Sequence, residues 1–210
     1  INEEHIAEVI SMMTGIPVKR MVEAETTKLR KMSEDMRDQV IGQEDAIGKV
    51  TPPEERTGVM IGGNMKSWYG GFDSFMLAKS ITNEIYSPQM GRRQEGEEQL
   101  GITQLPYLQW NEWISELSKR RIGIHMMRTH AAGTFAMNCA QLGIPCIGYE
   151  GLDTQRILHP ELTVKDMDLD TARKLVKKLD TDKDFFILCS KQAKDNYQKY
   201  YHESSFTIDG

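Results

Sequence analysis

The segment of this sequence best suited to chemistry runs from Arg128 to Phe135, between a predicted strand and a predicted helix. The first amides of a helix have no acceptor within it, and the helix dipole favours an anion beside them. We therefore expect the N–H groups of Gly133, Thr134 and Phe135 to bind an anion such as a phosphate group, with Gly133 allowing close approach. Arg128 and His130 would add charge. An ordinary capped helix with small packing residues is the alternative, because many such turns bind nothing.

A second segment, Gly62–Lys66 followed by Gly70 and Gly71, also comes directly after a predicted strand. Its glycines allow a ligand to approach the backbone, and Lys66 could contact a phosphate of that ligand. A flexible loop around Trp68 and Tyr69 explains the same residues equally well, and both interpretations stay open.

The third segment, Tyr149–Arg156, again follows a predicted strand. The carboxylates of Glu150 and Asp153 could accept hydrogen bonds from sugar or ribose hydroxyls, and Arg156 could pair with a phosphate. We also include His130, from the first segment, in this sugar-binding set. A surface loop with an internal ion pair is the alternative.

Other catalytic motifs are absent from the sequence. It has no G-x-x-x-x-G-K-[ST] loop, no G-x-G-x-x-G fingerprint, no H-E-x-x-H and no G-x-S-x-G. The remaining histidines form no ligand spacing and are interpreted as structural or exposed: His5, His125, His159 and His202. We therefore assign no catalytic residue, no metal and no covalently bound cofactor.

Composition limits the class of protein. The chain has 210 residues, 39% of them hydrophobic, and a net charge of −5. These values allow one ordinary domain with an appendage and argue against nucleic-acid binding through bulk basicity. The longest apolar runs are too short for a membrane span. Three cysteines without a C-x-x-C spacing predict buried thiols and a cytoplasmic location.

Short apolar runs alternate with amphipathic stretches after residue 56, and this pattern predicts a parallel sheet with helices on both faces. The fold class is α/β, Rossmann-like. Strands are expected at 58–63, 86–90, 102–108, 122–127 and 144–149, and helices at 72–85, 111–119, 133–142, 170–179 and 184–201. Ligands bind such sheets at the carboxyl ends of the strands, which is where the three segments lie.

The first 50 residues have a different pattern of apolar and polar residues. Apolar residues at helical spacing predict an all-helical segment that is interrupted at Thr14–Pro17 and again at Val40–Gln43. The polar run Thr51–Arg56 contains two adjacent prolines and reads as a linker. The predicted organisation is a helical segment at 1–50, a linker at 51–56 and a Rossmann-like domain at 57–210.

Two parts of the chain resemble different families. Residues 1–50 resemble the segment that leads into the second ATPase module of Clp-type AAA+ unfoldases. The motifs that carry this resemblance are Ile6–Ser11, Thr14–Val18 and Val40–Ile47. The family's phosphate loop and metal-binding motif do not follow Val50, so the resemblance implies a fragment without ATPase activity of its own, acting through subunit contacts.

Residues 57–210 look like the C-terminal, nucleotide-sugar-binding domain of a GT-B glycosyltransferase, on the strand and loop Val59–Asn64 and on the run His130–Gly148. The resemblance implies a nucleotide diphosphate sugar as donor substrate and an acceptor-binding domain that this chain lacks. Many retaining members carry two glutamates at the positions of His130 and Asn138. The family's usual diphosphate-binding Arg and Lys fall on Asn64 and Gly70.

The sequence therefore predicts a glycosyltransferase-like domain that is inactive alone, with a Clp-type unfoldase fragment as the alternative function. The two resemblances do not belong to one known family, and the chain opens on Ile1 rather than Met. We expect an incomplete chain or a fusion of two sources, natural or engineered.

Overall fold

The computed structural model describes residues 51–89, 91, 94–131 and 133–202. The predicted helices of residues 1–50 lie outside the described residues. The described strands are β1 (Thr57–Ile61), β2 (Ile85–Ser87), β3 (Thr103–Gln104), β4 (Arg120–His125), β5 (Cys146–Tyr149) and β6 (Thr163–Val164). The described α-helices are α3 (Gly71–Lys79), α4 (Trp110–Ser118), α5 (Thr134–Gln141), α6 (Asp153–Leu158), α7 (Leu169–Thr181) and α8 (Lys183–Tyr200).

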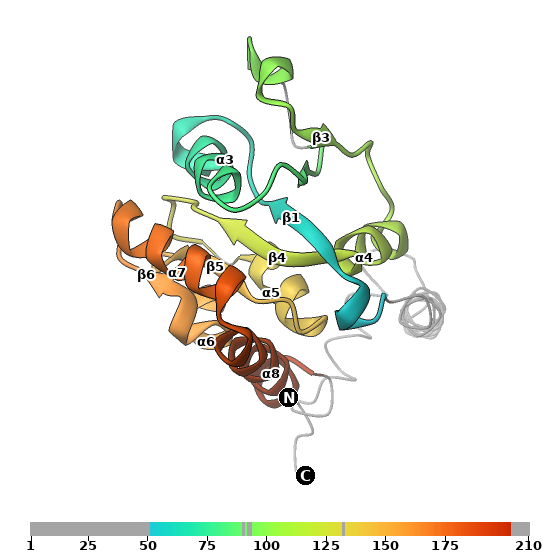
Figure 1. The fold of residues 1–210 in the computed structure, drawn as a ribbon, viewed down its shortest axis with the longest axis vertical. Helices are drawn as coiled ribbons and strands as arrows, with labels where there is room; N and C mark the ends of the chain where they lie inside the picture. The colour runs from blue at the N-terminus through green and yellow to red at the C-terminus, as the bar shows by residue number, and fades with distance from the viewer. Residues whose placement is uncertain (1–50, 90, 92–93, 132, 203–210) are drawn as a thin grey trace, which may run out of the picture. The chain divides into compact units, whose positions relative to one another are not determined.

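All six strands form one parallel sheet in the order β3-β2-β1-β4-β5-β6, as Figure 1 shows. The predicted Rossmann-like class is confirmed. The chain extends the sheet from β1 in one direction and then returns to place β4 on the other side of β1. Val59 lies beside Ile122 and Ile61 beside Ile124. The carboxyl ends of β1 and β4 are therefore neighbours at the point where the strand order reverses.

Alternating side chains of the strands form two apolar layers. Val59 and Ile61 of β1 pack on one face with residues of α3 and α7, whereas Met60 packs on the other face with α4 and α5. Helix α8 packs against α5, α6 and α7. Buried aliphatic side chains on both faces are typical of a parallel sheet that is covered by helices.

The boundaries of the predicted elements differ most from the structure in two places. The helix expected at 72–85 ends at Lys79, because the Thr82 side chain accepts from the Glu84 amide and forms a turn that leads into β2. The strand expected at 102–108 shortens to Thr103–Gln104, since Pro106 has no N–H to donate to the sheet. Sequence patterning missed α6 and β6, which have only six and two residues.

Two other expectations can be compared with the described residues. Cys139, Cys146 and Cys189 are buried free thiols, as predicted. Among the helices of the described ranges, none is both long enough and apolar enough to cross a membrane.

Candidate functional site

The three glycine-containing segments that the sequence singles out are joined at the carboxyl edge of the sheet. The Arg128 amide, after β4, donates to the Trp68 carbonyl, after β1, at 3.0 Å. Ala131 pairs with Leu152, after β5, in an isolated parallel bridge. Because β1, β4 and β5 are adjacent, the topology brings these loops side by side at the switch point of the sheet, the usual ligand position in this architecture.

Gly133 plays a different part from the one we expected. Its amide donates to the Thr154 hydroxyl at 3.1 Å, and that hydroxyl donates back to the Gly133 carbonyl at 2.8 Å. A Cβ atom at Gly133 would lie 2.7 Å from the same hydroxyl oxygen. The glycine therefore makes room for α6 rather than for a ligand, and its amide is not free to bind a phosphate.

The other two predicted amides begin α5. Gly133 is the N-cap of this helix, so the N–H groups of Thr134 and Phe135 belong to its first turn and have no acceptor within the helix. Thr134 is exposed, whereas the Phe135 side chain is buried in the apolar layer beneath α5. Burial of Phe135 holds the first turn of α5 against the apolar layer, and Thr134 lies at the surface beside it.

Two cations lie on the loops that follow β1 and β4. Arg128 Nη2 donates to Asp73 Oδ2 of α3 at 2.6 Å, and this hydrogen bond raises the pKa of the arginine. Lys66 Nζ lies 5.3 Å from the centre of the Trp68 ring, a cation–π contact at the surface. Both cations are at the edge where an anion would bind, and the charge of Arg128 is shared with a carboxylate.

Close packing explains the glycines of the first loop. A Cβ at Gly62 would lie 2.7 Å from the His125 ring, and one at Gly63 would lie 2.3 Å from the Tyr69 carbonyl oxygen. Gly70 has a φ of +64° and approaches the Met126 carbonyl so closely that no side chain fits. These contacts hold the loop after β1 against the end of β4.

The charged side chains of the segment after β5 are exposed, whereas Leu152 and Thr154 between them are buried. Asp153 and Arg156 form an ion pair one turn apart on α6, with 70% and 59% of their side chains exposed. This is the internal ion pair of the alternative interpretation. Glu150 is also exposed, and His130 Nε2 lies 3.8 Å from Asp166 Oδ2. These side chains stand at the rim of the edge and face solvent.

Two buried polar residues at the same edge were not assigned to the site from the sequence, which interpreted His125 as structural or exposed. His125 is the last residue of β4, and both ring nitrogens are buried without a partner. Burial lowers its pKa to about 4, so the ring is neutral. The Tyr149 hydroxyl, at the end of β5, is also buried and unpartnered. Burial and then the charge of Asp73 raise its pKa. Their position at strand ends was the available signal.

Asn138, which occupies a glutamate position of the resembled family, is a buried structural residue. With its amide oriented to satisfy both atoms, it donates to the Thr134 carbonyl at 3.1 Å and accepts from Trp113 Nε1 at 2.9 Å. It therefore ties α5 to α4. Within the described parts of the chain, no group of three His, Cys, Asp or Glu side chains could hold a metal ion.

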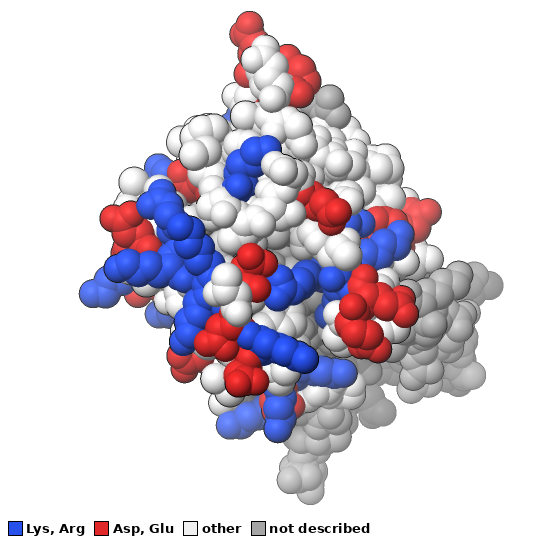
Figure 2. Space-filling view, in the orientation of Figure 1, with Lys and Arg blue, Asp and Glu red and all other residues white. Residues whose placement is uncertain are grey.

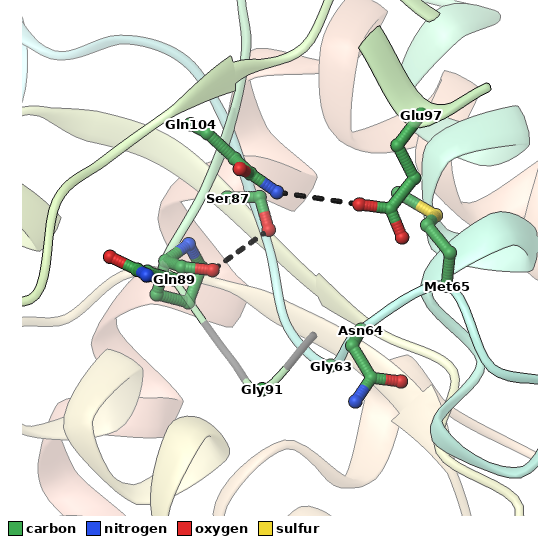
Figure 3. Close-up of a pocket in the computed structure, with 9 residues that line it drawn as sticks. Gly63, Asn64, Met65, Ser87, Gln89, Gly91, Glu97 and Gln104 are labelled. Atoms are coloured by element: carbon green, nitrogen blue, oxygen red, sulfur yellow. Dashed lines mark hydrogen bonds between the residues drawn. The ribbon is translucent and has the colours of Figure 1, made fainter. Parts of the chain in front are cut away.

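A pocket opens beside these loops, at the carboxyl ends of β1, β2 and β3 (Figure 3). Gln104 Nε2 lies 3.5 Å from Glu97 Oε2, and the Ser87 hydroxyl donates to the Pro88 carbonyl at 3.2 Å. The loop after β1 lines the other side of the pocket with Asn64 and Met65. The described residues that line it are polar or small, with the one carboxylate of Glu97 among them.

Solved glycosyltransferase structures share the fold of the described residues. The C-terminal domain of a group 1 glycosyl transferase, LpcC, from Francisella tularensis aligns with a TM-score of 0.58 and 13% identity, over 70% of this chain and 87% of that one. The described residues have the GT-B C-terminal-domain fold. Sucrose-phosphate synthase from Thermosynechococcus elongatus aligns with a TM-score of 0.57 and 16% identity, over 74% of this chain but only 43% of the enzyme. An Anabaena protein, HepE, solved with UDP-glucose, has a TM-score of 0.55 at 10% identity over 70% of this chain and 46% of that one.

The curated relatives match a shorter stretch of the chain. ClpB of Pseudomonas putida is 47% identical over 57 residues, and ClpB 1 of Synechococcus elongatus is 44% identical over 57 residues, in each case 27% of this chain. The chain spans 6 to 7% of the length of these relatives. The expected resemblance to Clp-type unfoldases over a short part of the chain is thereby confirmed. No family model matches the sequence.

Proposed function

We propose that residues 57–210 bind a nucleotide diphosphate sugar and form the donor half of a glycosyltransferase. The observation that carries this proposal is the joining of three loops at the switch point of the sheet, next to the first-turn amides of α5. The GT-B fold of the solved neighbours supports it, and one of those neighbours was solved with UDP-glucose.

The diphosphate would bind the amides of Thr134 and Phe135, with the Thr134 hydroxyl as an additional donor. Lys66 and Arg128 would neutralise its charge, and the helix dipole of α5 would act in the same direction. Fixed amides of this kind stabilise the negative charge that a departing nucleoside diphosphate acquires during glycosyl transfer.

The ribose and sugar would lie toward the rim that carries Glu150, Asp153, Arg156 and His130. The pocket between Asn64 and Gln104, lined by the Glu97 carboxylate, would take a hydrogen-bonding part of the donor rather than its phosphates. Acidic side chains gather at the tip formed by the segment around η3 (Glu97–Leu100), as Figure 2 shows, and would repel phosphates from that side.

This half supplies donor binding, whereas acceptor binding belongs to a second Rossmann-like domain. We expect no glycosyl transfer by this chain alone. We further propose that residues 1–50 are a separate Clp-like helical unit, joined to the domain through residues 51–56. The short identity with ClpB favours a second candidate function, in which that unit makes unfoldase-like subunit contacts without ATPase activity.

The test is a calorimetric titration of the full chain with UDP, GDP, ADP and ATP, using a pair of variants at Thr134. Proline is tolerated at the first position of a helix, so Thr134→Pro removes one amide donor and the hydroxyl while the helix still forms. Thr134→Ala removes only the hydroxyl and is the matched control.

Loss of one hydrogen bond to a charged group costs about 1.5–3 kcal/mol, which corresponds to roughly ten- to hundredfold in Kd. We expect UDP or GDP to bind in the micromolar range, and Thr134→Pro to bind at least tenfold more weakly than Thr134→Ala. Equal affinity of the two variants would show that the Thr134 amide does not bind the nucleotide. Absence of binding by every nucleotide would refute the donor-site proposal.

A further inference from the structure

The ion pair between Asp73 and Arg128 lies within the proposed donor site and joins two elements of it. Asp73 is in the first turn of α3, after β1, and Arg128 is in the loop between β4 and α5. Their side chains are 14% and 32% exposed, and Nη2 of the arginine is 2.6 Å from Oδ2 of the aspartate. An anion at the start of α5 would therefore meet an arginine that already has a carboxylate partner.

The remaining donors of this cluster are left without partners. Arg128 Nε is buried and unpaired, and so are the adjacent Thr129 hydroxyl and the Tyr149 hydroxyl. An unpaired buried polar atom costs about 1–3 kcal/mol, so such atoms are uncommon in a native protein. Three of them around one ion pair indicate a site with hydrogen-bonding capacity that the protein alone does not use.

Tyr149 is close enough to the ion pair for both charges to act on it. The negative charge of Asp73 raises the pKa of the phenol and that of Arg128 lowers it, while Asp166 and Asp168 act like Asp73. The phenol is thus a buried hydrogen-bond donor that lacks an acceptor in this arrangement. Asp73 is the acceptor whose charge acts on it most strongly.

We propose that Asp73 competes with the anionic ligand for Arg128 and so sets the affinity of the site, a role that rests on the proposed donor function. When the diphosphate binds, Arg128 turns from Asp73 and donates Nε–H and an Nη–H to phosphate oxygens. The Asp73 carboxylate then accepts from the Tyr149 hydroxyl. The structure described above is the arrangement in which the arginine is held by the carboxylate.

The test measures nucleoside diphosphate affinity of the full chain by calorimetry with UDP and GDP. Asp73→Asn keeps the size of the side chain and removes its charge, so Arg128 is released. We expect Kd to fall by about three- to tenfold, the effect of roughly 0.7–1.4 kcal/mol. Tyr149→Phe removes the alternative partner of Asp73 and should raise Kd about two- to fivefold.

A matched control separates this local competition from a general change in charge. Asp180 pairs with Arg121 at 2.9 Å, and Arg121 lies in the amino-terminal half of β4, away from the ligand edge. Asp180→Asn changes the net charge by the same amount and should leave Kd within twofold. In an Arg128→Gln background the further change Asp73→Asn should have no effect, because the two residues act as a unit.

Several outcomes would overturn the proposal. If the unaltered chain binds UDP or GDP and Asp73→Asn binds with the same or lower affinity, the competition is refuted while the donor function stands. An equal gain in Asp180→Asn, or a gain that survives in Arg128→Gln, refutes it as well. Failure of every variant to bind refutes the donor function along with it.

Discussion

Ser74 links the two loops that shape the candidate site, so its truncation should destabilise the domain measurably. The side chain is fully buried in α3. Its hydroxyl donates to the Gly70 carbonyl at 2.8 Å and accepts from the Met126 amide at 3.0 Å. In Ser74→Ala the Gly70 carbonyl keeps a second donor, the Ser74 amide at 2.9 Å, but the buried Met126 amide loses its acceptor.

The expected cost follows from that single orphaned amide. A buried donor without a partner costs about 1–3 kcal/mol, so we expect the free energy of unfolding to fall by about 2 kcal/mol. For a chain of this size, that corresponds to a decrease in Tm of about 4–8 °C. Urea unfolding followed by circular dichroism, together with a thermal scan, would measure both quantities.

Ser80 provides the matched control. Its hydroxyl donates to the Leu77 carbonyl at 2.7 Å, and that carbonyl also accepts from the Ser80 amide. Because Ser80 is exposed, Ser80→Ala leaves no buried group unpaired and should change stability by less than about 0.5 kcal/mol. If Ser74→Ala is as stable as Ser80→Ala, the proposed coupling of α3 to the end of β4 is wrong.

Two further perturbations test the loop geometry and the buried histidines. Gly63→Ala places a Cβ 2.3 Å from the Tyr69 carbonyl oxygen at a φ of +79°, so a steric clash adds to the backbone strain. We expect this variant to lose more than about 2 kcal/mol of unfolding free energy. Gly96→Ala, at a φ of +85° with open space around it, has the strain alone and should lose only about 1 kcal/mol. Equal costs in urea unfolding would contradict the close packing. His125 and His159 have folded pKa values of about 4, below the ordinary 6.5, so their neutral forms stabilise the fold above pH 6.5 and that stability is lost as the pH falls toward 4. We expect a loss of about 2 kcal/mol for each histidine between pH 7 and pH 5, and a flat unfolding free energy across that range would show that the rings are not buried neutral groups.

The alternation of apolar strands and amphipathic helices was sufficient to predict the parallel sheet and the edge at which the three segments meet. Val59–Ile61 and Ile122–Ile124 are continuous apolar runs because both faces of the sheet are covered, and such runs are readable in a single sequence. The short elements α6 and β6 could not be read, because six and two residues carry no clear period.

Individual site residues were harder to predict, since their roles depend on partners that are distant in sequence. Gly133 was interpreted as space for a phosphate, but that space belongs to Thr154, 21 residues later. Arg128 was interpreted as a free cation, although Asp73, 55 residues earlier, shares its charge. Only the packing of α3 against β4 and of α6 against α5 reveals these pairs.

The central claim is that the first amides of α5 bind the diphosphate of a nucleotide donor. The most direct measurement is an amide ¹H–¹⁵N spectrum of the labelled chain, recorded during titration with UDP and with GDP. The account predicts that the Thr134 and Phe135 amides shift most strongly and saturably, while the Gly133 amide, bonded to Thr154, shifts less. Saturable shifts that exclude Thr134 and Phe135, or no shifts with either nucleotide, would contradict it.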